Sequence, residues 1–135
     1  MFKVVLIKGD GIGPEIADTA VKIFDAAKVP IEWIESQAGL NTIDKHPSGI
    51  PEETFQAIRK YQIALKGPTT TPVGKGHKSV NVTLRKSLEL YANVRPAKSL
   101  PGVRTRFDNV DLIIVRENME DTYAGVEHIQ TVDVA

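Results

Sequence analysis

Two periodicities of hydrophobic residues alternate along the first ninety positions. Short β-branched runs predict strands, and apolar residues at helical spacing predict helices. The expected elements, in order, are a strand over 2–8, a helix from Pro14 that ends before Pro30, a strand over 31–36, a helix from Pro51 to about Lys60, a strand over 62–65 and a helix that begins at Ser79. Strands that alternate with helices predict an α/β fold built on a mostly parallel sheet.

The helix after Ser79 is predicted to bury one face, formed by Val80, Leu84, Leu88 and Tyr91. Two connections before it are polar and rich in glycine and proline. Residues 39–50 are therefore predicted to be irregular. Residues 66–78 are predicted to form a long loop, a feature that is often functional in compact domains.

The last third of the chain predicts extended structure. Residues 92–98 are expected to form a strand, and residues 100–109 a connector. Residues 110–115 are apolar except for Asp111, which predicts a strand covered on both faces. Residues 123–134 are expected to return as a further strand.

Composition narrows the class of protein. The 135 residues suit one domain, and 17 basic residues balance 17 acidic ones. A net charge of zero provides no global field for nucleic acid or an anionic membrane. There is no cysteine, which excludes disulfides and thiolate-bound metals. The apolar start runs into glycines and no apolar run nears ~20 residues, so we expect neither a signal peptide nor a membrane span.

The segment Gly9-Asp10-Gly11-Ile12-Gly13-Pro14-Glu15 lies at the first strand-to-helix turn. It resembles the dinucleotide fingerprint G-x-G-x-x-G but fails it, because Pro14 occupies the third glycine position. Two interpretations remain open. The turn approaches a ligand at a helix N-terminus, or it is an ordinary tight turn.

Ser79, Asn81 and Arg85 lie at the start of one predicted helix. Asn81 and Arg85 are four residues apart, hence on one face, so a hydroxyl, an amide and a guanidinium can meet an anion there. The alternative is a plain helix cap with a surface arginine.

Arg95 and Arg116 occupy strand positions. With Arg85 they would suit a substrate that carries several carboxylates, because each guanidinium can bind one of them bidentately. The alternative for each arginine is a surface salt bridge.

Tyr123, seven residues after Arg116, is a candidate proton donor or else a packing residue. The nearby acidic residues Glu117, Glu120 and Asp121 could bind a metal, although a solvated turn is the favoured interpretation.

Together these segments resemble the N-terminal part of isocitrate dehydrogenases, in the family of metal-dependent β-decarboxylating dehydrogenases. The resemblance covers essentially the whole chain. It rests on Gly9–Glu15, Lys66-Gly67-Pro68, Ser79-x-Asn81-x-x-x-Arg85, Tyr91–Pro96 and Arg116-Glu117-Asn118-x-Glu120-Asp121-x-Tyr123-Ala124-Gly125.

The resemblance implies a role for each candidate residue. Ser79 and Asn81 would hydrogen-bond the substrate, and serine at this position is typical of the isocitrate branch. Arg85, Arg95 and Arg116 would hold carboxylates, and Tyr123 would be the catalytic proton donor. Thr70 and Thr71, with Asn81, would lie at the nicotinamide end of NAD or NADP.

The resemblance also implies an α/β/α sandwich that is not a Rossmann fold and is incomplete in this chain. Residues 1–90 would belong to a large domain, and residues 91–135 would begin a small domain and a dimer contact. Mg²⁺ or Mn²⁺ would be required, with its ligands outside this chain. We therefore expect a cytoplasmic or mitochondrial homodimeric enzyme that acts on isocitrate, and a chain that is inactive alone. The alternatives are a 3-isopropylmalate or homoisocitrate dehydrogenase and a non-catalytic regulatory subunit.

Overall fold

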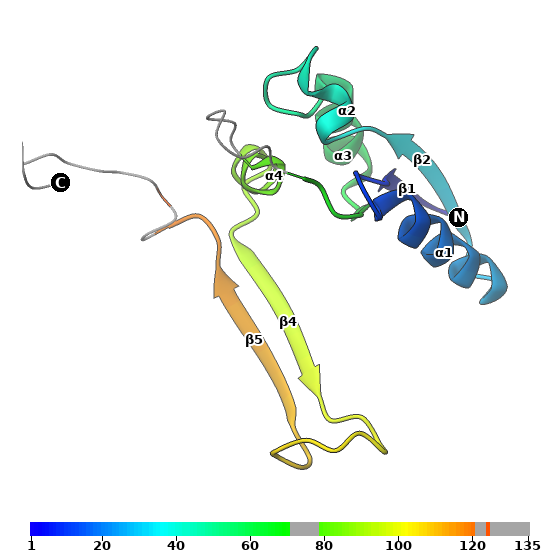
Figure 1. The fold of residues 1–135 in the computed structure, drawn as a ribbon, viewed down its shortest axis with the longest axis vertical. Coiled ribbons are helices and arrows are strands. Elements are labelled where there is room, and N and C mark those ends of the chain that lie inside the picture. Colours follow the sequence, from blue (N-terminus) through cyan, green and yellow to red (C-terminus); the bar gives the residue numbers. More distant parts are fainter. Residues whose placement is uncertain (71–78, 121–123, 125–135) are drawn as a thin grey trace, which may run out of the picture. The chain divides into compact units, whose positions relative to one another are not determined.

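The computed structural model describes residues 1–70, 79–120 and 124, which fall into two compact units, Met1–Leu84 and Arg85–Ala135 (Figure 1). The first unit contains β1 (Phe2–Ile7), α1 (Gly13–Ala26), β2 (Ile31–Ser36), α2 (Leu40–Ile43), α3 (Glu52–Tyr61) and β3 (Ala64–Lys66). Helix α4 (Val80–Ser87) begins in the first unit and ends in the second, which contains β4 (Ala92–Lys98) and β5 (Asp111–Glu117).

Strands β1, β2 and β3 form a parallel sheet in the order β2-β1-β3. The connection through α1 leads from β1 to its neighbour β2. The connection through α3 leads from β2 past β1 to β3, on the other side of β1. Because such crossovers are right-handed, the two helices cover opposite faces of the sheet. Phe24 of α1 packs edge-on against Trp33 of β2, with ring centroids 5.7 Å apart, and α3 contacts both β1 and β2.

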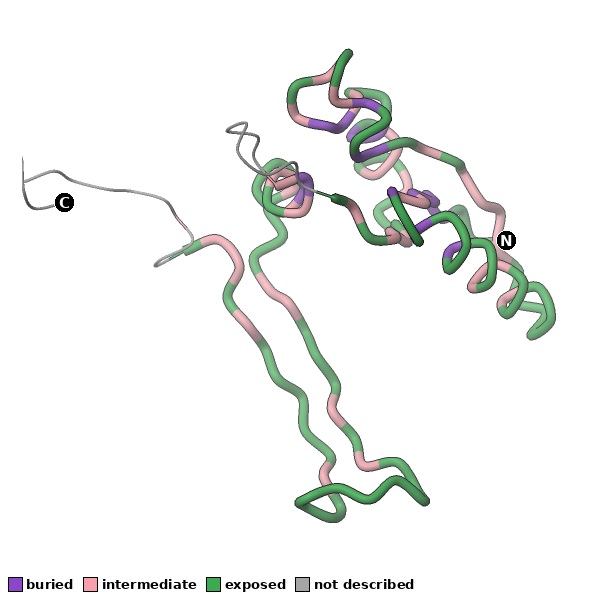
Figure 2. Tube along the Cα trace, in the orientation of Figure 1, coloured by how far each residue is buried: buried purple, intermediate pink, exposed green. Residues whose placement is uncertain are grey.

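The central strand β1 forms the core of this unit. Its residues Val4, Val5, Leu6 and Ile7 are between 0% and 7% exposed. Successive side chains of a strand point to opposite faces, so burial of four in a row means that both faces are covered. Figure 2 shows buried positions on this strand and on the helices and loops of the same unit. The parallel sheet with packed helices is thus confirmed.

One predicted connection contains an unexpected element. Residues 39–50 were expected to be irregular, but Leu40–Ile43 form the short helix α2. The buried Thr42 stabilises it, because its hydroxyl lies 2.9 Å from the Gly39 carbonyl oxygen and 2.7 Å from that of Gly49. This contact joins the two ends of the loop, which no local periodicity reveals.

Helix α4 buries less than predicted. Val80 and Leu84 are buried, but Tyr91 is 74% exposed, so the prediction for Tyr91 is wrong. The helix ends at Ser87, and Glu89 adopts a left-handed conformation with φ of 53°. The chain therefore leaves the helical path before it reaches Tyr91.

The second unit contains an antiparallel ribbon, in which β4 pairs with β5 so that Arg95 faces Ile114. The prediction that residues 110–115 are covered on both faces is wrong. Leu112, Ile113, Ile114 and Val115 are between 50% and 70% exposed. Their apolar character matches a buried strand, but most of the ribbon is coloured as exposed in Figure 2. The strand expected over 123–134 lies outside the described residues, apart from Ala124.

Candidate functional site

The three parallel strands end at one edge of the sheet, where their following loops meet. Glycines allow this contact. A Cβ added to Gly9 would collide with the carbonyl oxygen of Pro68, and a Cβ at Gly67 or Gly13 would collide with that of Lys8. Gly9 also has φ of +78°, a conformation that favours glycine. The turn after β1 therefore packs backbone to backbone against the segment after β3.

Asp10, between two of these glycines, is only 8% exposed. Its carboxylate accepts hydrogen bonds from the Leu40 N–H at 3.1 Å to each oxygen, and from the Thr70 N–H at 3.1 Å to Oδ2. Its own N–H donates to the Pro68 carbonyl at 2.9 Å. Asp10 was not among the predicted site residues. The available signal was an aspartate flanked by glycines directly after an apolar strand.

The segment after β3 carries two of the predicted cofactor contacts. Thr70 is exposed and anchored through its backbone to Asp10, and Thr71 lies outside the described residues. The neighbouring Thr69 hydroxyl is buried and has no hydrogen-bond partner. A buried polar group without a partner is uncommon, and a bound ligand at this edge would satisfy it.

Helix α4 presents the predicted anion-binding group. The Ser79 carbonyl accepts the first helical hydrogen bond, from the Thr83 N–H at 2.9 Å, which places Ser79 at the N-cap position. Asn81 and Arg85 follow one turn apart, and both are half-buried. The core face of the helix is formed by Val80 and Leu84 instead. Asn81 and Arg85 thus occupy helical positions other than those of the core face, and their role in binding an anion stays a prediction.

The ribbon brings two predicted arginines onto one face. Arg116 pairs directly with Asn93, and Arg95 lies two positions along β4 from Asn93, hence on the same face. The Arg95 Nε donates to the Asn93 Oδ1 at 3.3 Å. The convergence of Arg85 with these two arginines stays a prediction. Tyr123, the predicted proton donor, lies outside the described residues.

Glu117 ends β5 and organises the turn that follows. Its Oε1 accepts hydrogen bonds from the backbone N–H groups of Asn118, Met119 and Glu120, at 2.8, 2.7 and 3.2 Å. These donors favour the charged carboxylate and lower the pKa of Glu117 below its ordinary value. The N–H groups of Met119 and Glu120 have the largest effects. Within residues 1–70, 79–120 and 124, no group of three or more acidic, histidine or cysteine side chains could hold a metal ion.

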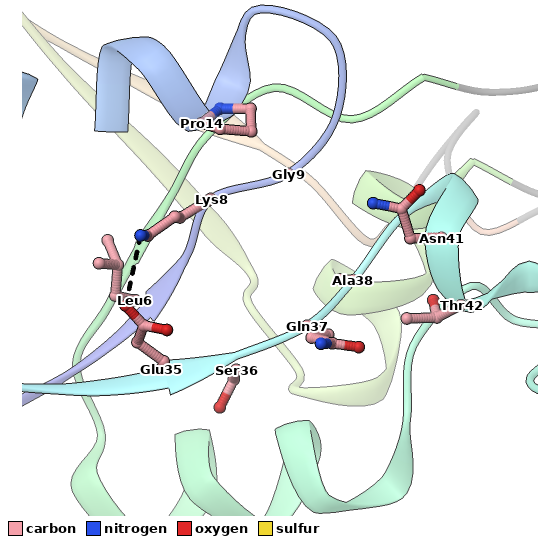
Figure 3. A pocket seen from close by; sticks show the side chains of 10 residues that line it. All are labelled: Leu6, Lys8, Gly9, Pro14, Glu35, Ser36, Gln37, Ala38, Asn41 and Thr42. Carbon is pink, nitrogen blue, oxygen red and sulfur yellow. Dashed lines mark ion pairs between the residues drawn. The ribbon is translucent and has the colours of Figure 1, made fainter. Parts of the chain in front are cut away.

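A polar cavity of about 300 Å³ lies at the ends of β1 and β2 (Figure 3). It is lined by Lys8, Glu35, Ser36, Gln37 and Asn41 among others. The Lys8 ammonium lies 2.9 Å from Asp18 Oδ1 and 3.3 Å from Glu35 Oε1, and these two carboxylates raise its pKa. The positive charge of Lys8 at this cavity is therefore already paired with two carboxylates. The candidate turn Gly9–Glu15 contributes Gly9 and Pro14 to the lining of the cavity, whereas the described residues of the predicted substrate-binding set do not line it.

Comparisons with known proteins agree with the predicted resemblance. The family model for isocitrate/isopropylmalate dehydrogenase matches residues 3–134. A relative named NAD isocitrate dehydrogenase catalytic subunit 5, mitochondrial, from Arabidopsis thaliana is 54% identical over 91% of this chain and 33% of its own length. The chloroplastic 3-isopropylmalate dehydrogenase of Solanum tuberosum is 51% identical over 95% of this chain and 36% of its own.

The same similarity holds for solved structures. The crystal structure of isocitrate dehydrogenase from Methylococcus capsulatus superimposes with a TM-score of 0.83 at 52% identity, over 98% of this chain and 39% of that one. The chain thus spans about a third of the length of the curated relatives it matches. No helix in the described residues has the length and apolar character needed to cross a membrane.

Proposed function

This chain belongs to the isocitrate/isopropylmalate dehydrogenase family, with that family's mixed α/β fold, and from this premise we propose that it supplies the substrate-binding part of an isocitrate dehydrogenase. The reaction is the oxidative decarboxylation of isocitrate to 2-oxoglutarate with NAD or NADP. Residues 1–90 form part of the large domain in this proposal. Residues 91–135 begin the small domain and the contact between two subunits.

The placement of Arg95 and Arg116 on one face of the ribbon carries the proposal. Isocitrate has three carboxylates, and two guanidinium groups on a shared face, with Arg85 as a third, suit a substrate of that charge. Ser79 and Asn81, at the start of α4, supply the hydroxyl and amide that orient it. Serine at position 79 favours isocitrate over 3-isopropylmalate.

A bound nicotinamide cofactor would supply the acceptor for the hydride that the substrate loses. Thr70, Thr71 and Asn81 hold its nicotinamide end in this proposal, and the unpartnered Thr69 hydroxyl fits a ligand at that edge. Tyr123 protonates the carbon from which carbon dioxide departs.

The family's divalent metal does not fit the described residues, because no cluster of ligands is present among them. We assign no step of the reaction to it here. We propose that the chain alone is catalytically silent, because it spans only about a third of the length of its relatives.

The test compares two proteins. One is the chain alone, and the other joins residues 1–135 to the remainder of the Methylococcus capsulatus enzyme to give a complete chain. We expect reduced nicotinamide to form with isocitrate and Mg²⁺ only in the complete chain. Turnover by the chain alone would contradict the proposal that it is inactive without the rest of the enzyme.

A second candidate substrate is 3-isopropylmalate, because a dehydrogenase named for it is 51% identical to this chain. Parallel assays with isocitrate and 3-isopropylmalate, each with NAD and with NADP, separate the two. Preference for 3-isopropylmalate would refute the proposal that Ser79 favours isocitrate as the substrate. Binding of isocitrate without any turnover in the complete chain would favour a regulatory subunit.

A further inference from the structure

Asp10 connects all three loops that follow the parallel strands. It lies in the turn after β1, it accepts the Leu40 N–H at the start of α2 beyond β2, and it accepts the Thr70 N–H beyond β3. Because β1, β2 and β3 are parallel, their carboxyl ends share one edge, which is where α/β proteins bind ligands. One carboxylate therefore joins the loops of the candidate cofactor edge.

The surrounding backbone is shaped to admit this carboxylate. Gly39, with φ of +118°, lies against it, and a Cβ at Gly39 would collide with the Asp10 side-chain oxygens. A Cβ at Gly9 would likewise collide with the Pro68 carbonyl oxygen, which accepts the Asp10 N–H. A buried carboxylate is costly unless it is hydrogen-bonded, and here backbone N–H groups supply the bonds.

The bond to Thr70 has the clearest consequence for function. It fixes the backbone of a segment whose neighbouring Thr69 hydroxyl is buried without a partner. A hydrogen bond to a charged acceptor is strong and directional, so it limits where this segment can lie.

We propose that Asp10 is a positioning residue, which holds the Thr69–Thr70 segment in the place where it meets the nicotinamide cofactor. This proposal rests on the proposed function only for the identity of the cofactor. Asp10 itself does not touch the reacting atoms. It acts through the backbone of Thr70.

The first experiment measures the contact directly in the 135-residue chain. Amide hydrogen exchange of Thr70 and Leu40 is followed by NMR in Asp10→Ala, in Asp10→Asn and in the control Asp25→Asn, which removes the charge of an exposed aspartate on α1. We expect exchange at Thr70 to be at least ~10-fold faster in Asp10→Ala, the change expected when a bond to a charged group is lost. Exchange at Val5 and Leu6 in the core stays unchanged. Asp10→Asn keeps one acceptor oxygen, so we expect its Thr70 exchange rate to lie between those of the wild type and Asp10→Ala.

The second experiment measures the consequence in the complete chain described above. Titration with NADH and with NADPH, followed by their fluorescence, gives a dissociation constant without any turnover. We expect Asp10→Ala to weaken cofactor binding ~10-fold, Asp10→Asn less, and Asp25→Asn not at all, while the KM for isocitrate stays within ~2-fold.

Three outcomes decide the proposal. Thr70 exchange in both Asp10 variants equal to that of Asp25→Asn overturns it. Faster exchange with unchanged cofactor affinity also overturns it, because Asp10 would then serve the fold alone. If wild type and variants differ as expected but isocitrate is not oxidised, the proposed substrate fails while the role of Asp10 stands.

Discussion

Strands β1 and β5 have similar sequences and opposite environments. Val4–Ile7 is at most 7% exposed, whereas Leu112–Val115 is at least 50% exposed. Both are continuous apolar runs. The difference lies in what covers them, since β1 is central in a sheet with helices on both faces and β5 belongs to a two-stranded ribbon. An apolar run thus predicts a strand well, but its burial depends on elements distant in sequence.

The largest contrast should appear when one isoleucine in each strand is truncated. We expect Ile7→Ala to lower the free energy of unfolding of the chain by about 2–5 kcal/mol, because it leaves a cavity in a packed core. Ile113→Ala should change it by less than about 0.5 kcal/mol, because the side chain is 70% exposed. Scanning calorimetry of both variants measures the two effects. Equal losses would mean that the ribbon is covered in solution.

The same contrast explains which elements could be predicted from the sequence and which could not. Strands 2–8 and 31–36 were placed within one residue of β1 and β2, because β-branched runs and flanking glycine or proline are local signals. The covering of 110–115 and the burial of Tyr91 were predicted wrongly, because each depends on whether distant chain packs there. Helix α2 was missed because Thr42 stabilises it through a contact seven residues away.

The candidate site divides in the same way. The one-turn separation of Asn81 and Arg85 follows from helical spacing. The shared face of Arg95 and Arg116 follows once the register of β4 with β5 is known. Asp10 could not be found by spacing, because its bonds reach 30 and 60 residues along the chain.

A second contrast uses two glycines in left-handed conformations. Gly9 lies in the packed edge of the sheet with φ of +78°, and Gly102 lies in the connector of the ribbon with φ of +81°. We expect Gly102→Ala to cost about 1 kcal/mol, because open space surrounds it and only backbone strain is added. Gly9→Ala should cost about 2–4 kcal/mol, because its Cβ would also collide with the Pro68 carbonyl oxygen. Urea denaturation compares them, and equal losses would exclude a packing role for Gly9.

The ribbon should matter more for binding than for stability. In the complete chain we expect Arg95→Ala to raise the KM for isocitrate by ~10- to ~100-fold, the effect of losing a charged hydrogen bond to a carboxylate. Arg104→Ala, which removes an exposed arginine of the connector, serves as the matched control and should leave KM unchanged. The unfolding of both variants should resemble that of the wild type. Equal KM values for the two variants would mean that Arg95 does not bind the substrate.

The smallest effect concerns the turn after β5, which is held by exposed hydrogen bonds rather than by burial. Backbone N–H groups lower the folded-state pKa of Glu117, so this carboxylate stabilises the turn above its unfolded pKa, and that contribution is lost as pH falls through the lowered value. NMR amide shifts of Asn118, Met119 and Glu120 should therefore titrate together, with a midpoint below the ordinary glutamate pKa of 4.5. Glu117→Gln should abolish this titration and leave the core amides of β1 unmoved. A shared midpoint at or above 4.5 would mean that these N–H groups do not favour the carboxylate in solution.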